Sequence, residues 1–111
     1  MIVTEAAEAL GLEVLTGAQN LGRTITGGCT SDLLSYVMGK AKAGNLWITI
    51  QIHPNIVGVG ELLELAAIVV ADGQEPEPAT LEKARQQGVT ILTGRETAFA
   101  LAGKLYALGV K

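Results

Sequence analysis

The chain has 111 residues, a formal net charge of −3 and one cysteine. An acidic balance without a Lys/Arg cluster argues against broad affinity for nucleic acid or an anionic membrane, and one cysteine excludes an internal disulfide. Charged residues make up 17%, below the roughly 25% of an average soluble domain, so we expect one domain over residues 1–111 that buries surplus apolar surface in a homodimer.

The sequence shows no sign of a secretory or membrane-spanning segment. Glu5 and Glu8 stand where a secretory signal would carry positive charge. The most apolar run, 62–71, is interrupted by Glu64 and is too short to span a bilayer. A cytoplasmic location without membrane contact is therefore expected.

Local signals in the first third of the chain predict a short helix and then a strand. Thr4 can cap the helix and Gly11 ends it, and the apolar residues 12–15 predict the strand. A polar segment, 16–21, leads into a glycine-rich stretch, 22–32. Because adjacent glycines favour irregular backbone, we expect this stretch to be a loop.

Helices and strands alternate in the middle of the chain. A helix is predicted from Asp32 to Gly44, with Thr30 or Ser31 as its N-cap. Residues 46–52 are almost continuously apolar, as expected of a strand covered on both faces.

The same alternation continues towards the C-terminus. Pro54 starts a helix and 67–71 predicts a second buried strand. Pro78 starts another helix, which Gly88 ends, and 89–92 predicts the last strand.

The final helix is predicted to begin at a capping box formed by Thr93 and Glu96 and to end at Gly109. Trp47 and Phe99 fit regular apolar patterns, so both are expected in the core.

Two glycines, Gly58 and Gly60, lie inside the helix that follows Pro54. Glycine weakens a helix interior, so close approach of another backbone or a ligand is expected there, and a helix–helix interface is the simplest case.

Buried strands that alternate with helices predict an α/β fold, a layered α/β/α sandwich with a mainly parallel sheet of about four strands. In such sheets, ligands bind beyond the carboxyl ends of the strands. The polar residues expected at that edge are the candidate ligand-binding residues Arg23, Thr24, Thr26, Gly27, Gly28, Gln51, His53, Asn55, Asp72 and Arg95.

The glycine-rich stretch is the leading candidate for a phosphate site. Backbone N–H groups of a glycine loop that opens a helix form an anion cradle, and Arg23 or Arg95 would add positive charge. Asp72, Asn55 or Gln51 would contact hydroxyl groups or base edges. The alternative is that these are ordinary loop residues.

The residue types do not predict catalysis, a metal or a cofactor. Gly22 and Gly27 have the first spacing of a Walker A motif, but Gly28 and Cys29 stand where Lys and Ser/Thr are required. Cys29 has neither a second cysteine nor an evident base beside it. The one histidine, His53, suits a turn or helix cap as well as a ligand contact.

Several segments together resemble the DRTGG domain. They are Arg23-Thr24, Thr26-Gly27-Gly28, Ser31-Asp32-Leu33-Leu34, Leu46-Trp47-Ile48-Thr49-Ile50-Gln51 and His53-Pro54-Asn55-Ile56-Val57. The resemblance covers nearly the whole chain, although Gly22 precedes Arg23 where the family has aspartate.

The resemblance implies an α/β domain, often dimeric, found fused to phosphate acetyltransferases and to nucleotide-regulated CBS-domain pyrophosphatases. The leading hypothesis is therefore a non-enzymatic regulatory module that binds a phosphate-bearing small molecule, such as a nucleotide, and acts through its dimer or a partner enzyme. The alternative is a purely structural dimerisation or protein-interaction domain without a small-molecule ligand.

Overall fold

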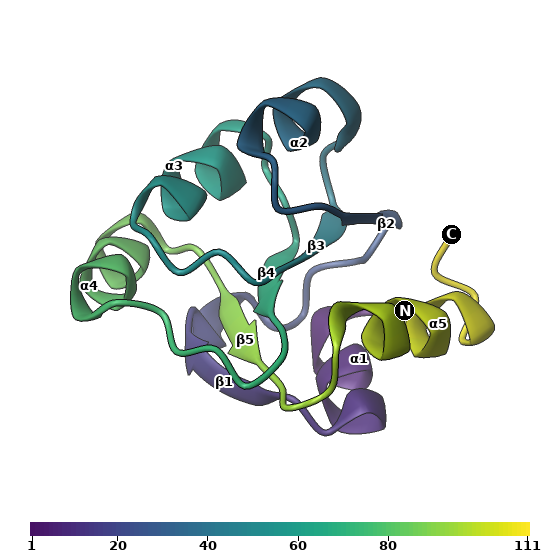
Figure 1. Ribbon diagram of the computed structural model, residues 1–111. Helices are drawn as coiled ribbons and strands as arrows, with labels where there is room; N and C mark the ends of the chain where they lie inside the picture. Colours follow the sequence, from purple (N-terminus) through teal and green to yellow (C-terminus); the bar gives the residue numbers. More distant parts are fainter.

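A computed structural model describes all residues, 1–111, as a five-stranded sheet with helices on both faces (Figure 1). The elements in chain order are α1 (Val3–Leu10), β1 (Glu13–Thr16), the short 3-10 helix η1 (Ala18–Asn20), β2 (Gly27–Thr30), α2 (Leu34–Lys40), β3 (Asn45–Thr49), α3 (Asn55–Leu62), β4 (Ala67–Val70), α4 (Pro78–Gln87), β5 (Ile91–Thr93) and α5 (Ala98–Ala107).

The sheet has the strand order β1-β5-β4-β3-β2. Strands β2 to β5 are parallel, and β1 pairs antiparallel with β5 at one edge. The predicted α/β/α sandwich with a mainly parallel sheet is confirmed, but the sheet has five strands rather than about four. The additional strand is β2, which the sequence had suggested to be a loop.

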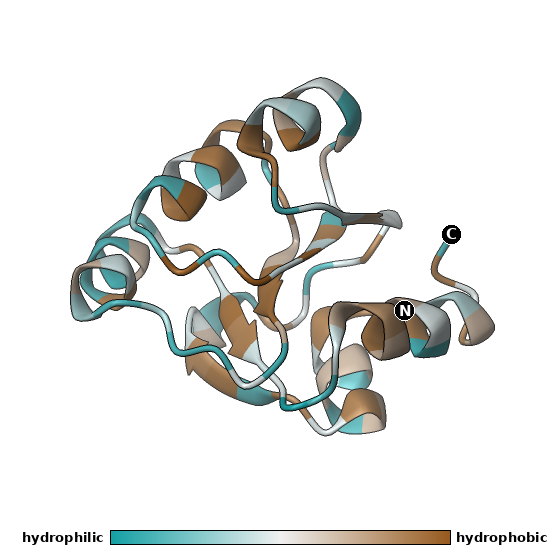
Figure 2. Ribbon diagram, in the orientation of Figure 1, coloured by the Kyte–Doolittle hydropathy of each residue, from teal (hydrophilic) through white to brown (hydrophobic).

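Two hydrophobic clusters lie on opposite faces of the sheet. Helices α2, α3 and α4 pack on one face, around Val37, Ile56 and Ala84. Helices α1 and α5 pack on the other, around Ala6 and Leu101 (Figure 1). Colouring by hydropathy shows strongly apolar residues on the central strands between these layers (Figure 2). None of the helices is both long and apolar enough to cross a membrane.

Several helix ends follow from local backbone chemistry, as predicted. Gly11 and Gly88 end α1 and α4 with positive φ values of 65° and 70°, a conformation that glycine adopts without steric cost. Pro78 stands at the start of α4, where its missing N–H costs nothing.

The predicted starts of α2 and α5 are wrong. The N-cap of α2 is Leu33, without a side-chain cap, because residues 27–30 pair with β3 and delay the helix. The N-cap of α5 is Thr97, whose side chain accepts a hydrogen bond from Ala100 N. Thr93 lies in β5, where its hydroxyl donates to Val70 O.

The prediction that Trp47 lies in the core is confirmed, and the same prediction for Phe99 is wrong. Trp47 is fully buried, and its Nε1 donates to Ser31 O at 2.8 Å. Phe99 is 90% exposed, because Leu101 and Leu105 occupy the inward face of α5.

The two glycines inside α3, Gly58 and Gly60, differ in how closely other atoms approach them. A Cβ at Gly60 would lie 2.9 Å from Ile68 Cδ1, so this glycine makes room for a side chain of β4 rather than for the backbone, helix or ligand that was expected. At Gly58 the nearest atom would be Lys83 Nζ at 3.6 Å, so no close approach explains this glycine.

Candidate ligand-binding cleft

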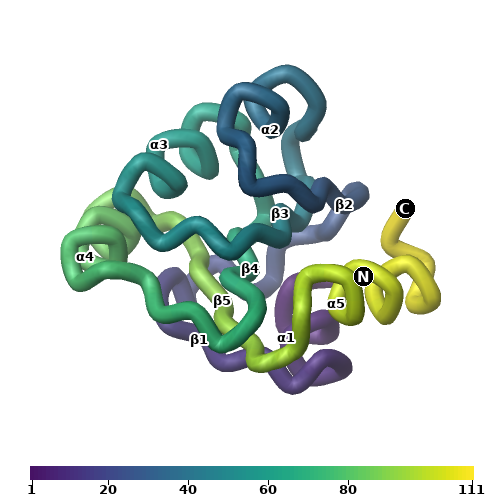
Figure 3. The backbone as a smooth tube through the Cα atoms, viewed as in Figure 1, coloured from purple at the N-terminus to yellow at the C-terminus, as the bar shows by residue number.

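The connections that follow two neighbouring parallel strands, β4 and β5, lead to opposite faces of the sheet. After β4 the chain enters α4 on one face, and after β5 it enters α5 on the other (Figure 3). The two connections diverge at the carboxyl ends of the strands, so this point is the topological switch point, where sheets of this class leave a crevice.

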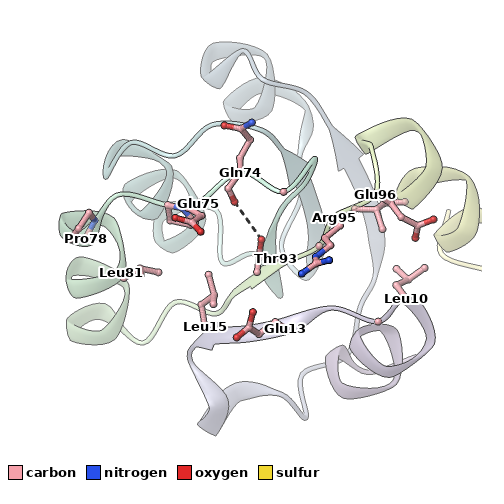
Figure 4. A pocket seen from close by; sticks show the side chains of 15 residues that line it. Leu10, Glu13, Leu15, Gln74, Glu75, Pro78, Leu81, Thr93, Arg95 and Glu96 are labelled. Atoms are coloured by element: carbon pink, nitrogen blue, oxygen red, sulfur yellow. Dashed lines mark hydrogen bonds between the residues drawn. The ribbon is translucent and has the colours of Figure 1, made fainter.

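A cleft of about 720 Å³ lies at this point, within the range of small-molecule sites (Figure 4). It is lined by Leu10, Gly11, Glu13, Leu15, Gly73, Gln74, Glu75, Pro76, Pro78, Leu81, Thr93, Gly94, Arg95, Glu96 and Leu101. These residues come from the α1–β1 corner, the β4–α4 connection and the β5–α5 connection.

Backbone hydrogen bonds hold the two connections together. Asp72 N donates to Glu96 O at 2.8 Å, and Gly73 N donates to Gly94 O at 2.9 Å. Asp72 and Gly73 both have positive φ, 62° and 66°, so the chain turns sharply immediately after β4. The bonds fix the floor of the cleft, and a ligand would meet preformed walls.

The charged side chains of the cleft are mostly unpaired. In Figure 4, Arg95, Glu13 and Glu75 point into it from different elements. None of the three forms an ion pair, whereas Glu96 binds Lys104 Nζ at 2.7 Å. Their charges are therefore available to a ligand.

Backbone donors accompany Arg95. The N–H groups of Arg95, Glu96 and Thr97 donate no hydrogen bond within the chain, and they immediately precede α5. Free N–H groups at the start of a helix, with the positive end of its dipole, favour an anion. The Arg95 guanidinium adds a full charge, with donors suited to a phosphate.

The predicted residues do not all meet at this cleft. Of the ten, Arg95 lines it, and Asp72 borders it through the residue that follows, Gly73. Gln51, His53 and Asn55 follow β3 at the same edge of the sheet but do not line the cleft.

The side chains after β3 make local contacts. Gln51 Nε2 donates to Asp32 O at 3.0 Å, which joins the ends of β2 and β3. His53 Nδ1 accepts from Asn55 N at 3.1 Å and caps the start of α3, the cap role considered for this histidine. Asn55 is the first residue of that helix.

The placement of the glycine-rich stretch at the carboxyl edge is wrong. Gly27 and Gly28 lie in β2, and Arg23, Thr24 and Thr26 precede it, so these three lie at the amino ends of the parallel strands. The expected cradle does not exist, because these glycines form a strand rather than a loop that opens a helix.

Polar side chains near the start of β2 bind neighbouring backbone. Arg23 donates to Leu65 O at 2.9 Å and to Glu64 O at 3.2 Å. Thr26 Oγ1 donates to Ala43 O at 2.8 Å, and Thr24 forms an isolated bridge with Ile2. These contacts hold the amino edge of the sheet together.

Cys29 lies in β2 and is half-buried. Burial raises the pKa of its thiol, because the thiolate would lose hydration. A raised pKa keeps the thiol protonated at neutral pH, the opposite of what an activated nucleophile requires.

Glu13 and Glu75 are the two unpaired acidic residues of the cleft, and neither was among the predicted site residues. Glu13 pairs with Thr93 across β1 and β5, an antiparallel contact between distant segments for which the sequence carries no local signal. Glu75 lies between the predicted strand 67–71 and the helix that Pro78 starts; its position after β4 was the signal that could have identified it.

Comparisons with known proteins bear on the fold. No protein-family model matches the chain, and no curated protein does. Among solved structures, the chain is similar to the CBS and DRTGG domains of the regulatory region of Clostridium perfringens pyrophosphatase, which were crystallised with the activator diadenosine tetraphosphate. The TM-score is 0.71 at 14% identity, over 94% of this chain and 45% of that chain. The likeness shows a DRTGG-like fold, in a chain that spans less than half the length of its neighbour.

Proposed function

We propose that the chain is a non-enzymatic regulatory module that binds a phosphate-bearing small molecule, such as a nucleotide, in the cleft between β4 and β5. The observation that carries the proposal is the unpaired Arg95 guanidinium in a cleft of about 720 Å³ at the switch point of the sheet. The backbone N–H groups of Arg95 and Glu96, which also lines the cleft, and of the next residue, Thr97, donate no hydrogen bond within the chain. This arrangement combines the charge and the donors that a phosphate group needs.

The structural neighbour supports a regulatory role. It is the regulatory region of an enzyme, and it was crystallised with a nucleotide activator. By analogy, the chain would act on a partner enzyme or through its own dimer. A ligand that contacts both the β4–α4 and the β5–α5 connections would stabilise one arrangement of the surface around them. The affinity of a partner that binds this surface would then depend on whether the ligand is bound.

The proposal is tested by thermal unfolding at fixed protein concentration with nucleotides, acyl phosphates and sugar phosphates. A ligand at a hundred times its Kd stabilises the folded state by about 2.7 kcal/mol, which raises Tm by several degrees. Arg95→Gln should abolish the rise.

Lys42→Gln is the matched control. It removes one positive charge from an exposed turn before β3, at the opposite edge of the sheet. The rise in Tm should remain in this variant. A flat response of the wild type across the panel, or an equal response of Arg95→Gln, would contradict the proposal.

The alternative, a dimerisation or protein-interaction domain, has one observation in its favour. The outward face of α5 exposes the uncharged residues Phe99, Gly103, Tyr106 and Ala107. The exposed Lys104 beside them is paired with Glu96, and Lys111 Nζ lies 5.1 Å from the centre of the Tyr106 ring. Surface helices usually place charged residues on this face. Such a face suits an interface, and it is compatible with a ligand in the cleft.

A further inference from the structure

The two sides of the cleft differ in chemistry, and this inference rests on the proposed function. Arg95 stands on the α5 side, while Leu81, Leu15 and Glu75 stand on the α4 side (Figure 4). A ligand whose phosphate contacts Arg95 therefore extends its other end towards the apolar side chains of the α4 side.

The α4 side suits a flat ring. Leu15 of β1 and Leu81 of α4 are both half-buried and present apolar surface to the cleft, and Pro78 lies beside Leu81. Apolar walls favour the faces of an aromatic base, and the polar edge of that base must then find partners on the rim.

The Glu75 carboxylate is a polar group on this rim, and Glu13 lies on the same strand as Leu15. The Glu75 side chain makes no hydrogen bond or ion pair within the protein and points into the cleft (Figure 4). An ionised carboxylate only accepts hydrogen bonds, so it pairs with two adjacent N–H donors.

We infer that the α4 side of the cleft is a base subsite in which Glu75 selects a ring edge with two adjacent N–H donors, the edge of guanine. The adenine edge offers one donor beside one acceptor, and its ring nitrogen lone pair would face the carboxylate. That lone pair and the carboxylate oxygens are all acceptors and repel one another, so the subsite rejects adenine more strongly than a purely apolar pocket would.

Calorimetric titration of the wild type with GMP, IMP and AMP in EDTA tests this inference. The chelator removes any divalent cation that could bridge a phosphate to the carboxylates. GMP should bind about tenfold more tightly than AMP, which corresponds to one charged hydrogen bond. IMP lacks the second donor and should bind with intermediate affinity.

Glu75→Gln should bring the affinities for GMP and AMP close together, because an amide can pair with either edge. Glu61→Gln is the matched control, an exposed carboxylate near the end of α3, at the opposite edge of the sheet, and should keep the tenfold preference. Circular dichroism would verify that both variants are folded.

The outcomes separate the two proposals. Equal or tighter binding of AMP by the wild type would overturn the base subsite and leave phosphate binding at Arg95 intact. Loss of the preference in Glu13→Gln instead of Glu75→Gln would overturn the assignment to Glu75. No measurable binding of any of the three nucleotides would overturn both the subsite and nucleotide binding in the cleft.

Discussion

Asp32 shows how one side chain can hold two strand ends in place. Its Oδ1 accepts from Thr49 Oγ1 at 2.9 Å and from Ile50 N at 2.8 Å. Its backbone oxygen accepts from Gln51 Nε2. The residue thus ties the end of β2 to the end of β3, and Thr49, which it bonds, is fully buried.

Asp32→Ala should lower the free energy of unfolding by about 1–3 kcal/mol, because it leaves the buried Thr49 hydroxyl without its acceptor. Urea unfolding followed by circular dichroism measures the loss. Asp32→Asn keeps an acceptor oxygen and should lose less. Equal stability of Asp32→Ala and the wild type would show that the bond contributes nothing.

At the scale of elements, β2 is the one that local sequence signals misidentify. Glycine is a poor strand former, and two adjacent glycines indicate a loop. Here contacts with the neighbouring strand and the C-terminus determine the conformation. Strand β2 pairs with β3 over four residues, and Val110 and Lys111 pack against the two glycines. Tertiary contacts therefore override the local preference.

Gly28→Ala should raise the free energy of unfolding by about 0.5 kcal/mol, because the position is exposed, has an ordinary φ and offers a Cβ normal contacts from 3.8 Å. Urea unfolding again measures the change. The Tm response to nucleotides should be unchanged, since the glycine lies outside the cleft.

Gly27→Ala is the comparison. The new Cβ would lie only 3.2 Å from Asn45 Nδ2, so this variant should show no increase in the free energy of unfolding. A Gly28→Ala variant that folds normally but no longer responds to nucleotides would contradict the placement of the site.

Other elements were predictable because their signals are local. Proline at the start of α4 and glycine at its end act within one turn, and the sequence alone indicated both boundaries. The cleft was not predictable in full. Arg95 follows a predicted strand, but Glu13 reaches the site only through the pairing of β1 with β5, which joins distant segments.

At the scale of the whole molecule, α5 connects the cleft to an exposed surface. Its N-terminal end follows Arg95, and its outward face carries Phe99 and Tyr106, 90% and 61% exposed. These rings lie on either side of Gly103, where a Cβ would meet no atom within 4 Å. A second copy packed antiparallel about a two-fold axis would place each Phe99 against Tyr106 of the other copy.

We expect the wild type to be a dimer through this face and Phe99→Glu to be a monomer, because two carboxylates would be buried in the interface. Light scattering after size exclusion measures the mass. Leu62→Glu, on α3 at the other face of the sheet, is the control and should remain dimeric. A monomeric wild type, or a dimeric Phe99→Glu, would contradict the α5 interface.

The most direct test of the cleft is a titration of ¹⁵N-labelled protein with GMP, followed through the backbone amide resonances. The structure predicts saturable shifts concentrated at residues 73–75 and 93–97, where the two connections line the cleft and the free N–H groups lie. Saturable shifts centred on residues 23–28, or no saturable shift at all, would contradict a phosphate site between β4 and β5.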